Sequence, residues 1–344
     1  LTHSTGWVVW EAGRVQMPVI DLEPFATGVD RASPDAIRIA AALDRALRDV
    51  GFVTVVGHGV PADVKARYFD AMRAFFDQPT EAKQAIAIGN SPYHRGYVGF
   101  EAEALDGALG NDDDAIGSAV AGDLKETLDT GTEYALDHPL VVAGTPLHGP
   151  NQWPDLPGFR AAYDEYRSAV IEAALRMQRA MAMALGLDPD FFADQPGDTM
   201  FHLRLIHYPP QSRMTPAAGQ FGCGAHTDYG TLTVLSDDGV GGLQVRLRSG
   251  DWVDVIVPEG HLVVNIGDLM AIWTDDRWVS NPHRVVNPPG VDRYSSALFV
   301  TPPFHARIET LRTCLDATGE SRHGALVAGP YLLSRFDGTH AYRA

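Results

Sequence analysis

The sequence has few cysteines and few positive charges, and each shortage excludes a class of protein. Cys223 and Cys314 are its only two cysteines, which excludes a disulfide-stapled fold and favours a reducing compartment such as the cytosol. Lysine and arginine total 27 against 44 aspartates and glutamates, a formal net charge of −17. This surplus would repel nucleic acid and anionic lipid, so we expect neither as a partner.

Long apolar runs are also missing. No uninterrupted run approaches the roughly 18 residues that a membrane-spanning helix needs, and the first residues lack the charged-then-apolar order of a secretory signal. The chain has 344 residues, 45% of them hydrophobic and 21% charged, which is typical of a globular protein with a large core. We therefore expect a cytoplasmic protein without a membrane partner, and the sequence does not indicate its oligomeric state.

The first half of the chain combines short strands with helices. A strand is expected over 17–22, followed by a helix that Ser33 caps and Gly51 ends. A β-branched strand over 52–56 precedes a second helix, and a long helix is expected near 157–186. The expected buried side of the second helix carries Val64, Tyr68, Met72, Phe75 and Phe76. Together these elements predict a helical layer in the N-terminal half.

Residues 90–155 are rich in glycine, proline and aspartate, which indicates loops. Within them, the acidic run 112–114 could bind a metal, but three adjacent carboxylates more often lie in a solvated loop. We expect the solvated loop.

From about residue 200 the hydrophobic period changes from helical to two. The expected strands are Phe201–Tyr208, Thr231–Ser236, Gly242–Leu247, His261–Ile266 and Ser295–Thr301. Turn-forming residues separate several of them, which favours an antiparallel sandwich or barrel over a parallel sheet. The fold class predicted is mainly β with α (α+β): a helical layer supporting a C-terminal antiparallel barrel.

One short motif carries chemistry. His226 and Asp228 are two residues apart, and on a strand such positions face the same way. His283, well downstream, can supply a third ligand. Two histidines and one carboxylate on one face of a metal leave its other face open, which suits iron(II). A histidine followed by aspartate is common by chance, so the ordinary interpretation of His226 alone is a polar residue near a strand end.

A candidate anchor for a carboxylate follows the third candidate ligand. Arg293 opens another strand-like run, with Ser295 two residues later. A guanidinium is always charged and offers a fork that matches a carboxylate. Arg293 alone could form a surface salt bridge, but together with the three ligands it indicates a site for a metal-chelating carboxylate.

The chain resembles the isopenicillin N synthase-like group of iron(II)/2-oxoglutarate oxygenases over nearly its whole length. The family pattern of His-x-Asp, a distal His and Arg-x-Ser is present. Further landmarks lie at Pro18–Leu22, Gly51–Val60, Arg95–Tyr97, Asp123–Glu126, Asp238–Val245 and Val264–Asp268. The resemblance implies a double-stranded β-helix, or jelly roll, in agreement with the strand pattern.

The resemblance also implies a domain division. It implies one oxygenase domain over 1–344, with an α/β support region at 17–190. The jelly-roll core would occupy about 200–305, and a C-terminal helix and tail 306–344.

Roles follow from the same resemblance. His226, Asp228 and His283 would bind Fe(II), while Arg293 and Ser295 would hold the distal carboxylate of 2-oxoglutarate. The implied reaction consumes O2, releases succinate and CO2, and hydroxylates or desaturates a small-molecule substrate, with ascorbate as a candidate reductant. An amino acid or a natural-product intermediate is a plausible substrate by analogy with the family.

Two further residues are implicated on the strand that ends at Tyr208. Tyr208 matches a tyrosine that helps to bind the co-substrate in many members, although plant members carry Asn where this chain has Ile206. This segment looks closer to bacterial members, including the ethylene-forming enzyme, which implies that Arg204 faces the active site. Arg204 is therefore a candidate second carboxylate anchor; the alternative is an arginine at the barrel rim paired with a surface acid.

Other residues near the motif are assigned minor roles. Phe299 shares a strand face with Ser295 and is expected to pack under the site. Cys223 could be a fourth ligand or part of a zinc site, but a thiolate beside O2-activating iron would be prone to oxidation. The remaining histidines considered are expected to be structural or at the rim: His202, His207 and His261.

Three functions remain open at this point. The first is a 2-oxoglutarate-dependent hydroxylase or desaturase. The second is an oxidase or cyclase of the same fold that uses no 2-oxoglutarate, in which Arg293 and Ser295 would hold the substrate carboxylate. The third is a non-enzymatic binding or sensor protein, which the intact ligand set disfavours. Substrate specificity is expected to come from 90–155, the loop near 209–222 and the C-terminal tail, none of which identifies a substrate.

Overall fold

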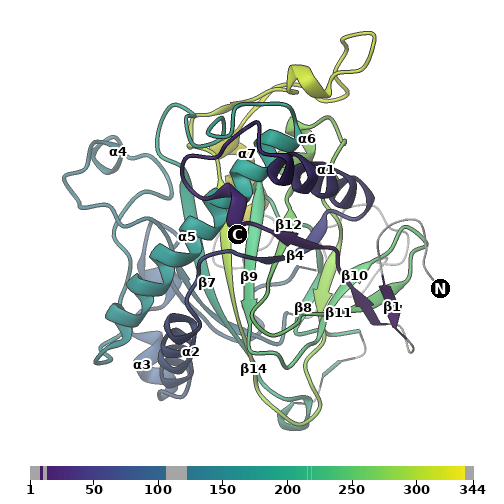
Figure 1. The fold of residues 1–344 in the computed structure, drawn as a ribbon. Helices are drawn as coiled ribbons and strands as arrows, with labels where there is room; N and C mark the ends of the chain where they lie inside the picture. The colour runs from purple at the N-terminus through teal and green to yellow at the C-terminus, as the bar shows by residue number, and fades with distance from the viewer. Residues whose placement is uncertain (1–7, 11–13, 106–121, 215, 218, 338–344) are drawn as a thin grey trace.

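The computed structural model describes residues 8–10, 14–105, 122–214, 216, 217 and 219–337 (Figure 1). Two large β-sheets, a two-stranded ribbon, a layer of helices and two further helices make up this part of the chain. The acidic run 112–114 lies outside the described residues. None of the helices in the described ranges combines the length and apolar composition that crossing a bilayer would require.

The larger sheet has eight strands among the described residues. In spatial order they are β3 (Val19–Asp21), β4 (Phe52–Val56), β12 (Leu262–Ile266), β9 (Leu232–Asp237), β14 (Arg293–Thr301), β7 (Met200–Tyr208), β6 (Glu126–Thr130) and β5 (Gly96–Val98). All neighbours are antiparallel except β3 and β4. The strands of this sheet that the period-two pattern predicted are confirmed, each within two residues at either end.

The smaller sheet has six strands in the same ranges. Their order is β1 (Val8–Trp10), β2 (Arg14–Gln16), β11 (Trp252–Ile256), β10 (Leu243–Arg246), β13 (His283–Val285) and β8 (Cys223–His226). The first two lie in an N-terminal segment for which no strand was expected, and β2 pairs in parallel with β11. The two sheets face one another as in a jelly roll, and this confirms the predicted α+β fold.

Helices cover the outer face of the larger sheet. They are α1 (Pro34–Asp49), α2 (Ala62–Phe76) and α5 (Phe159–Ala184), with the short α3 (Thr80–Gln84) and α4 (Pro139–Val142) beyond them. Ser33 caps α1 as expected, because its side chain accepts a hydrogen bond from the backbone of Ala36. Gly51 follows the helix with φ +73°, the left-handed conformation that ends helices and favours glycine.

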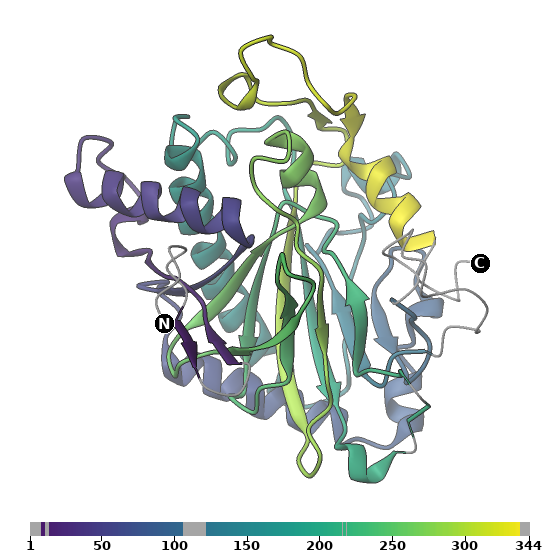
Figure 2. The same cartoon turned by 90° about the vertical axis from the view of Figure 1, so that its right-hand side faces the viewer.

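Two more helices lie outside this layer. They are α6 (Asp268–Trp273), which follows β12, and α7 (Ala328–Asp337), which follows the two-stranded ribbon of β15 (Arg307–Ile308) and β16 (Leu326–Val327). Figure 2 shows α1, in purple, at the left and α7, in yellow, at the right, with the strands between them. The C-terminal helix is therefore separated from α1 by the barrel.

Alternation along the strands sorts side chains between two cores. Val234, Val264 and Leu298 join the helices in the main core, while Leu235 and Ala297 point between the two sheets. Successive strand residues face opposite ways. The residues that point to the same side as Leu235 and Ala297 therefore line the barrel interior. The strand register thus decides which side chains can reach a site inside the barrel.

Candidate active site

The two histidines of the motif face each other across the smaller sheet. His226 on β8 is directly opposite His283 on β13, and their ring centroids are 4.3 Å apart. Asp228 lies two residues beyond the end of β8. The prediction that His226 and Asp228 share one space is confirmed, but Asp228 lies in the irregular segment after the strand and not on the strand itself.

Backbone carbonyl groups orient both imidazoles. Nδ1 of His226 donates to the carbonyl oxygen of Gly224 at 2.8 Å, and Nδ1 of His283 donates to that of Asn281 at 3.2 Å. A carbonyl can only accept, so the tautomer that makes this hydrogen bond has its lone pair on Nε2. Each Nε2 lies 3.7 Å from Oδ1 of Asp228. A hydrogen bond from Nδ1 to a backbone carbonyl fixes the tautomer whose Nε2 can bind a metal.

The three side chains form a metal-sized cluster. One potential ligand atom from each of His226, Asp228 and His283 lies within 4.8 Å of the other two. Burial raises the pKa of Asp228, but the two imidazoles and hydrogen bonds from Thr233 and Asn265 outweigh it and lower that pKa. Burial, with the neighbouring His226, lowers the pKa of His283 to about 4. At neutral pH the set therefore holds a carboxylate and a neutral His283, the forms that bind a divalent metal.

An inner cavity extends from this cluster into the barrel, with about 570 Å³ of empty space, part of it open to solvent. Arg293 and Ser295 line it. Arg293 is 1% exposed, and it donates through Nε to the Gly241 carbonyl oxygen at 2.6 Å and through Nη1 to Ser295 Oγ at 3.0 Å. Its Nη2 is buried and has no hydrogen-bond partner in the part of the chain that the structure describes. A buried, incompletely satisfied guanidinium fits the carboxylate of a co-substrate.

Tyr208 lies against this arginine. The Arg293 guanidinium is 4.8 Å from the centroid of the Tyr208 ring, and Tyr208 is directly opposite Arg293 in the β7–β14 register. The tyrosine ring thus orients the guanidinium by a cation–π contact. Burial raises the pKa of the Tyr208 hydroxyl, so it stays protonated and can donate a hydrogen bond.

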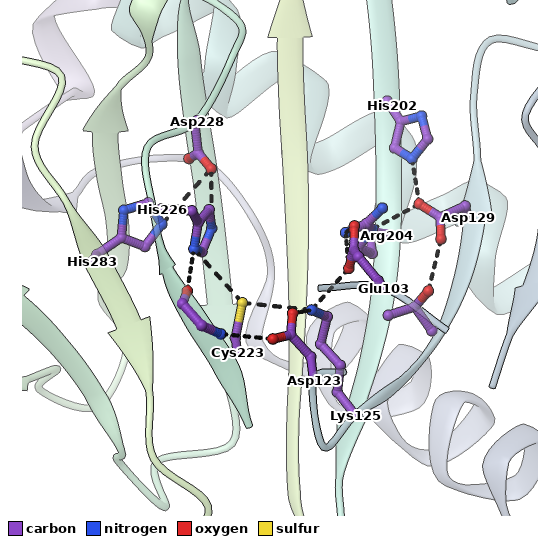
Figure 3. Close-up of polar contacts among 12 residues, drawn as sticks. Glu103, Asp123, Lys125, Asp129, His202, Arg204, Cys223, His226, Asp228 and His283 are labelled. Atoms are coloured by element: carbon purple, nitrogen blue, oxygen red, sulfur yellow. Dashed lines mark hydrogen bonds and ion pairs between the residues drawn. The ribbon is translucent and has the colours of Figure 1, made fainter. Parts of the chain in front are cut away.

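Arg204 lies in a buried network of charges (Figure 3). Its Nε donates to Asp129 at 2.7 Å, and its Nη1 lies 3.1 and 3.2 Å from the two oxygens of Glu103. Lys125 contacts Glu103 at 2.8 Å and also pairs with Asp123. Both acids that contact Arg204 are buried, unlike the surface acid considered above. These contacts leave Nη2 as the remaining donor of Arg204.

Cys223 and the other histidines lie outside the metal cluster. Cys223 Sγ is 3.8 Å from Nδ1 of His226, the nitrogen that already donates to Gly224. Burial raises the pKa of Cys223 to about 12, so it is a thiol and not a thiolate ligand. His202 contacts Asp129 and His207 contacts Glu126, each at 2.7 Å. Both have structural partners, as expected.

An outer cavity meets the inner one at the metal cluster, with about 850 Å³ of empty space, part of it open to solvent. Much of its wall is apolar or aromatic: Leu105, Tyr134, Leu147, Met200, Phe201, Tyr229, Phe299, Leu332 and Phe336. Five residues line both cavities: Leu105, Arg204, His226, Asp228 and Phe299. Phe299 therefore packs beside the cluster, as predicted from its place on the same strand face as Ser295.

Several residues at this site were not found by sequence reasoning. Glu103 and Asp129 contact Arg204, and Lys125 contacts Glu103. The C-terminal tail was expected to contribute to specificity, but its two residues in the outer wall, Leu332 and Phe336 of α7, were not named. The segment 123–126 was matched as a family landmark, but without a role for Lys125. Leu332 and Phe336 are four residues apart, the spacing of one helix face, which marks a buried face without saying what it covers.

Comparison with known proteins identifies the family. Residues 17–156 match the N-terminal region of the non-haem dioxygenases named for morphine synthesis, and residues 200–302 match the 2OG-Fe(II) oxygenase superfamily. The chain belongs to this family of 2-oxoglutarate-dependent Fe(II) dioxygenases, which use Fe(II), 2-oxoglutarate and O2. It is an oxidoreductase, as its sequence predicted.

Individual relatives support this family assignment. The chain is 36% identical to the 2-oxoglutarate-Fe(II) type oxidoreductase hxnY of Emericella nidulans over 287 residues, covering 82% of this chain and 78% of the relative. It is 32% identical to a homoarginine-6-hydroxylase of Glycine max, covering 93% and 96% of the two chains. The crystal structure of a Neurospora crassa protein in complex with alpha-KG and thymine superposes with a TM-score of 0.77 and 29% identity, covering 95% and 98%. Homoarginine and thymine are small molecules, which fits a small-molecule substrate.

Proposed function

We propose that His226, Asp228 and His283 bind the iron(II), and that Arg293 with Ser295 binds the distal carboxylate of 2-oxoglutarate. The observation that carries the proposal is the buried Nη2 of Arg293, for which the described residues offer no hydrogen-bond partner. A buried charge without a counter-ion is costly, and a carboxylate in the inner cavity would remove that cost. Lone pairs on two Nε2 atoms and a carboxylate supply a suitable metal-binding set at the other end.

His226, Asp228 and His283 would hold the iron, which would supply O2 activation coupled to oxidative decarboxylation of 2-oxoglutarate to succinate and CO2 as the substrate is oxidised. The chain orients the reactants around it. Tyr208 holds the Arg293 guanidinium in place, and Phe299 lines both cavities beside the cluster. Keeping water out of such a site limits side reactions.

The outer cavity is proposed to hold the substrate. It touches the metal cluster through His226 and Asp228, so a molecule there would present a C–H bond to the iron. Its aromatic and aliphatic wall suits a compact molecule with an apolar or planar part. The remaining donor of Arg204 is proposed as the polar contact to the substrate or to the co-substrate. Hydroxylation and desaturation are both compatible with this arrangement.

The decisive test uses the anaerobic iron(II) protein. Addition of 2-oxoglutarate should produce a visible charge-transfer band in the wild type, and the Arg293→Ala protein should need far more 2-oxoglutarate to produce it. Arg277→Ala is the matched control, because Arg277 pairs with Asp44 outside both cavities. A wild-type protein that binds iron and gives no band would overturn the proposal and favour an oxidase that uses Arg293 for its own substrate.

Three further expectations are part of the proposal. The support region at 17–190, the core at about 200–305 and the tail at 306–344 are proposed to form a single oxygenase domain. The two free cysteines fit a cytoplasmic location. Ascorbate is proposed as a reductant that keeps the iron ferrous.

A further inference from the structure

The two oxygens of Asp228 face different surroundings. Oδ1 lies 3.7 Å from Nε2 of each histidine in the cluster. Oδ2 accepts hydrogen bonds from Thr233 Oγ1 at 2.5 Å and from Asn265 Nδ2 at 2.6 Å. Asp228 is 5% exposed, so these protein donors, and not bulk water, surround Oδ2. One oxygen is thus directed at the metal position and the other is held away from it.

The two donors belong to the larger sheet, whereas the histidines belong to the smaller one. Thr233 on β9 is directly opposite Asn265 on β12, and both side chains line the inner cavity. Strands at the centre of a sheet are held on both sides, so such a pair forms a rigid platform. The backbone of Asp228 is held too, because the N–H of Asp268 donates to its carbonyl oxygen at 2.7 Å. Asp228 is therefore fixed at both its main chain and its side chain.

We propose that Thr233 and Asn265 are positioning residues that keep Asp228 a one-oxygen metal ligand. The inference rests on the proposed function. A carboxylate can bind a metal through one oxygen or two. Six-coordinate iron(II) with two imidazoles and one carboxylate oxygen keeps three positions for the co-substrates. A second oxygen from Asp228 would take one of them and would compete with 2-oxoglutarate.

This role predicts a behaviour that simple stabilisation does not. Loss of a buried hydrogen bond destabilises a fold wherever the bond lies. Loss of a bond to Oδ2 should in addition free that oxygen to swing toward the metal. The metal should then be retained, or held more tightly, while the affinity for 2-oxoglutarate falls.

The test compares Thr233→Val and Asn265→Ala with two reference proteins. Thr233→Ser keeps the hydroxyl that donates to Asp228. Thr231→Val removes another buried threonine hydroxyl, which donates to the Val300 carbonyl oxygen at 2.9 Å and not to Asp228. The first measurement is the Kd of 2-oxoglutarate from the charge-transfer band of the anaerobic iron(II) protein. The second is the visible absorption of the cobalt(II)-loaded protein, whose intensity reports the number of ligands.

Thr233→Val and Asn265→Ala each remove a hydrogen bond to a charged group, so each should raise the Kd of 2-oxoglutarate by about 10- to 100-fold and alter the cobalt(II) spectrum. Thr233→Ser and Thr231→Val should stay near the wild type in both. If Thr233→Val does not fold, Asn265→Ala against Thr231→Val decides the question alone. The inference is overturned if both variants match Thr231→Val. Absence of a band from the wild type itself would instead contradict the proposed function.

Discussion

The inner and outer cavities share the metal cluster but are built differently. The inner cavity is lined largely by barrel strands, with Arg293, Ser295 and Tyr208 on the paired strands β7 and β14. The outer cavity takes much of its wall from loops and from α7. Backbone ladders hold the inner residues in register, whereas the outer wall depends on contacts between distant segments. This difference explains why the sequence predicts the reaction class and does not identify the substrate.

The largest effect should come from Asp228, which both cavities share. Asp228→Ala removes the one charged ligand of the proposed set and leaves two imidazoles, so iron affinity should fall by more than about 100-fold. Turnover should fall below detection. Iron content after dialysis and circular dichroism check this. An Asp228→Ala protein with full iron and normal succinate release would show that Asp228 is not an iron ligand.

Next in size is the change that should affect the inner cavity alone. Arg293→Ala should weaken 2-oxoglutarate binding by about 2–5 kcal/mol, the usual cost of losing one partner of a buried charge pair. At about 1.4 kcal/mol per factor of ten, that is roughly 30- to several-thousand-fold in Kd. Calorimetric titration of the anaerobic protein measures it. Equal 2-oxoglutarate affinity in the variant would show that the inner cavity does not bind 2-oxoglutarate through Arg293.

A smaller effect is expected when the outer wall is trimmed. Phe336→Ala and Leu332→Ala each remove apolar contact area. Each should weaken substrate binding by about 1–3 kcal/mol and so raise the KM roughly 10- to 200-fold. The affinity for 2-oxoglutarate should stay close to that of the wild type. Succinate release with a substrate found by metabolite screening gives both numbers. A matching loss of 2-oxoglutarate affinity would break the distinction between the cavities.

The smallest effect should come from the support layer, outside both cavities. Ser33→Ala removes the cap of α1 and should lower the free energy of unfolding by about 1 kcal/mol. Metal and 2-oxoglutarate binding should be unchanged. Urea unfolding with and without ligands tests this. A loss of ligand affinity larger than the loss of stability would mean that the helical layer also positions the site.

Local patterns predicted the frame of the molecule well. The Ser33 cap, the Gly51 stop and the period-two strands depend on neighbouring residues only. One strand with the same pattern, Trp252–Ile256, was missed although its burial alternates as expected for a strand. The position of Asp228 could not be derived from strand alternation alone, because the strand ends at His226 and Asp228 lies in the irregular segment that follows.

Long-range pairing was beyond sequence reasoning. Arg204 was singled out as facing the site, but its partners Glu103 and Asp129 lie 101 and 75 residues away in the chain. No local period encodes such pairs, since they depend on how β6, β7 and the segment at 103 assemble. The same limit applies to the hydrogen bonds from Thr233 and Asn265 to Asp228. Their residue types were visible, and their common target was not.

The attachment of α7 has a consequence for how this enzyme can diverge. The helix contributes Leu332 and Phe336 to the outer cavity, yet it forms no part of either barrel sheet. Tyr331 anchors it through a hydrogen bond to Asp268 at 3.1 Å. Mutations on its inner face would therefore leave the strand ladders and the proposed iron ligands in place. With the substrate in the outer cavity as proposed, changes in this one helix would alter which molecule is accepted before they altered the oxidative chemistry.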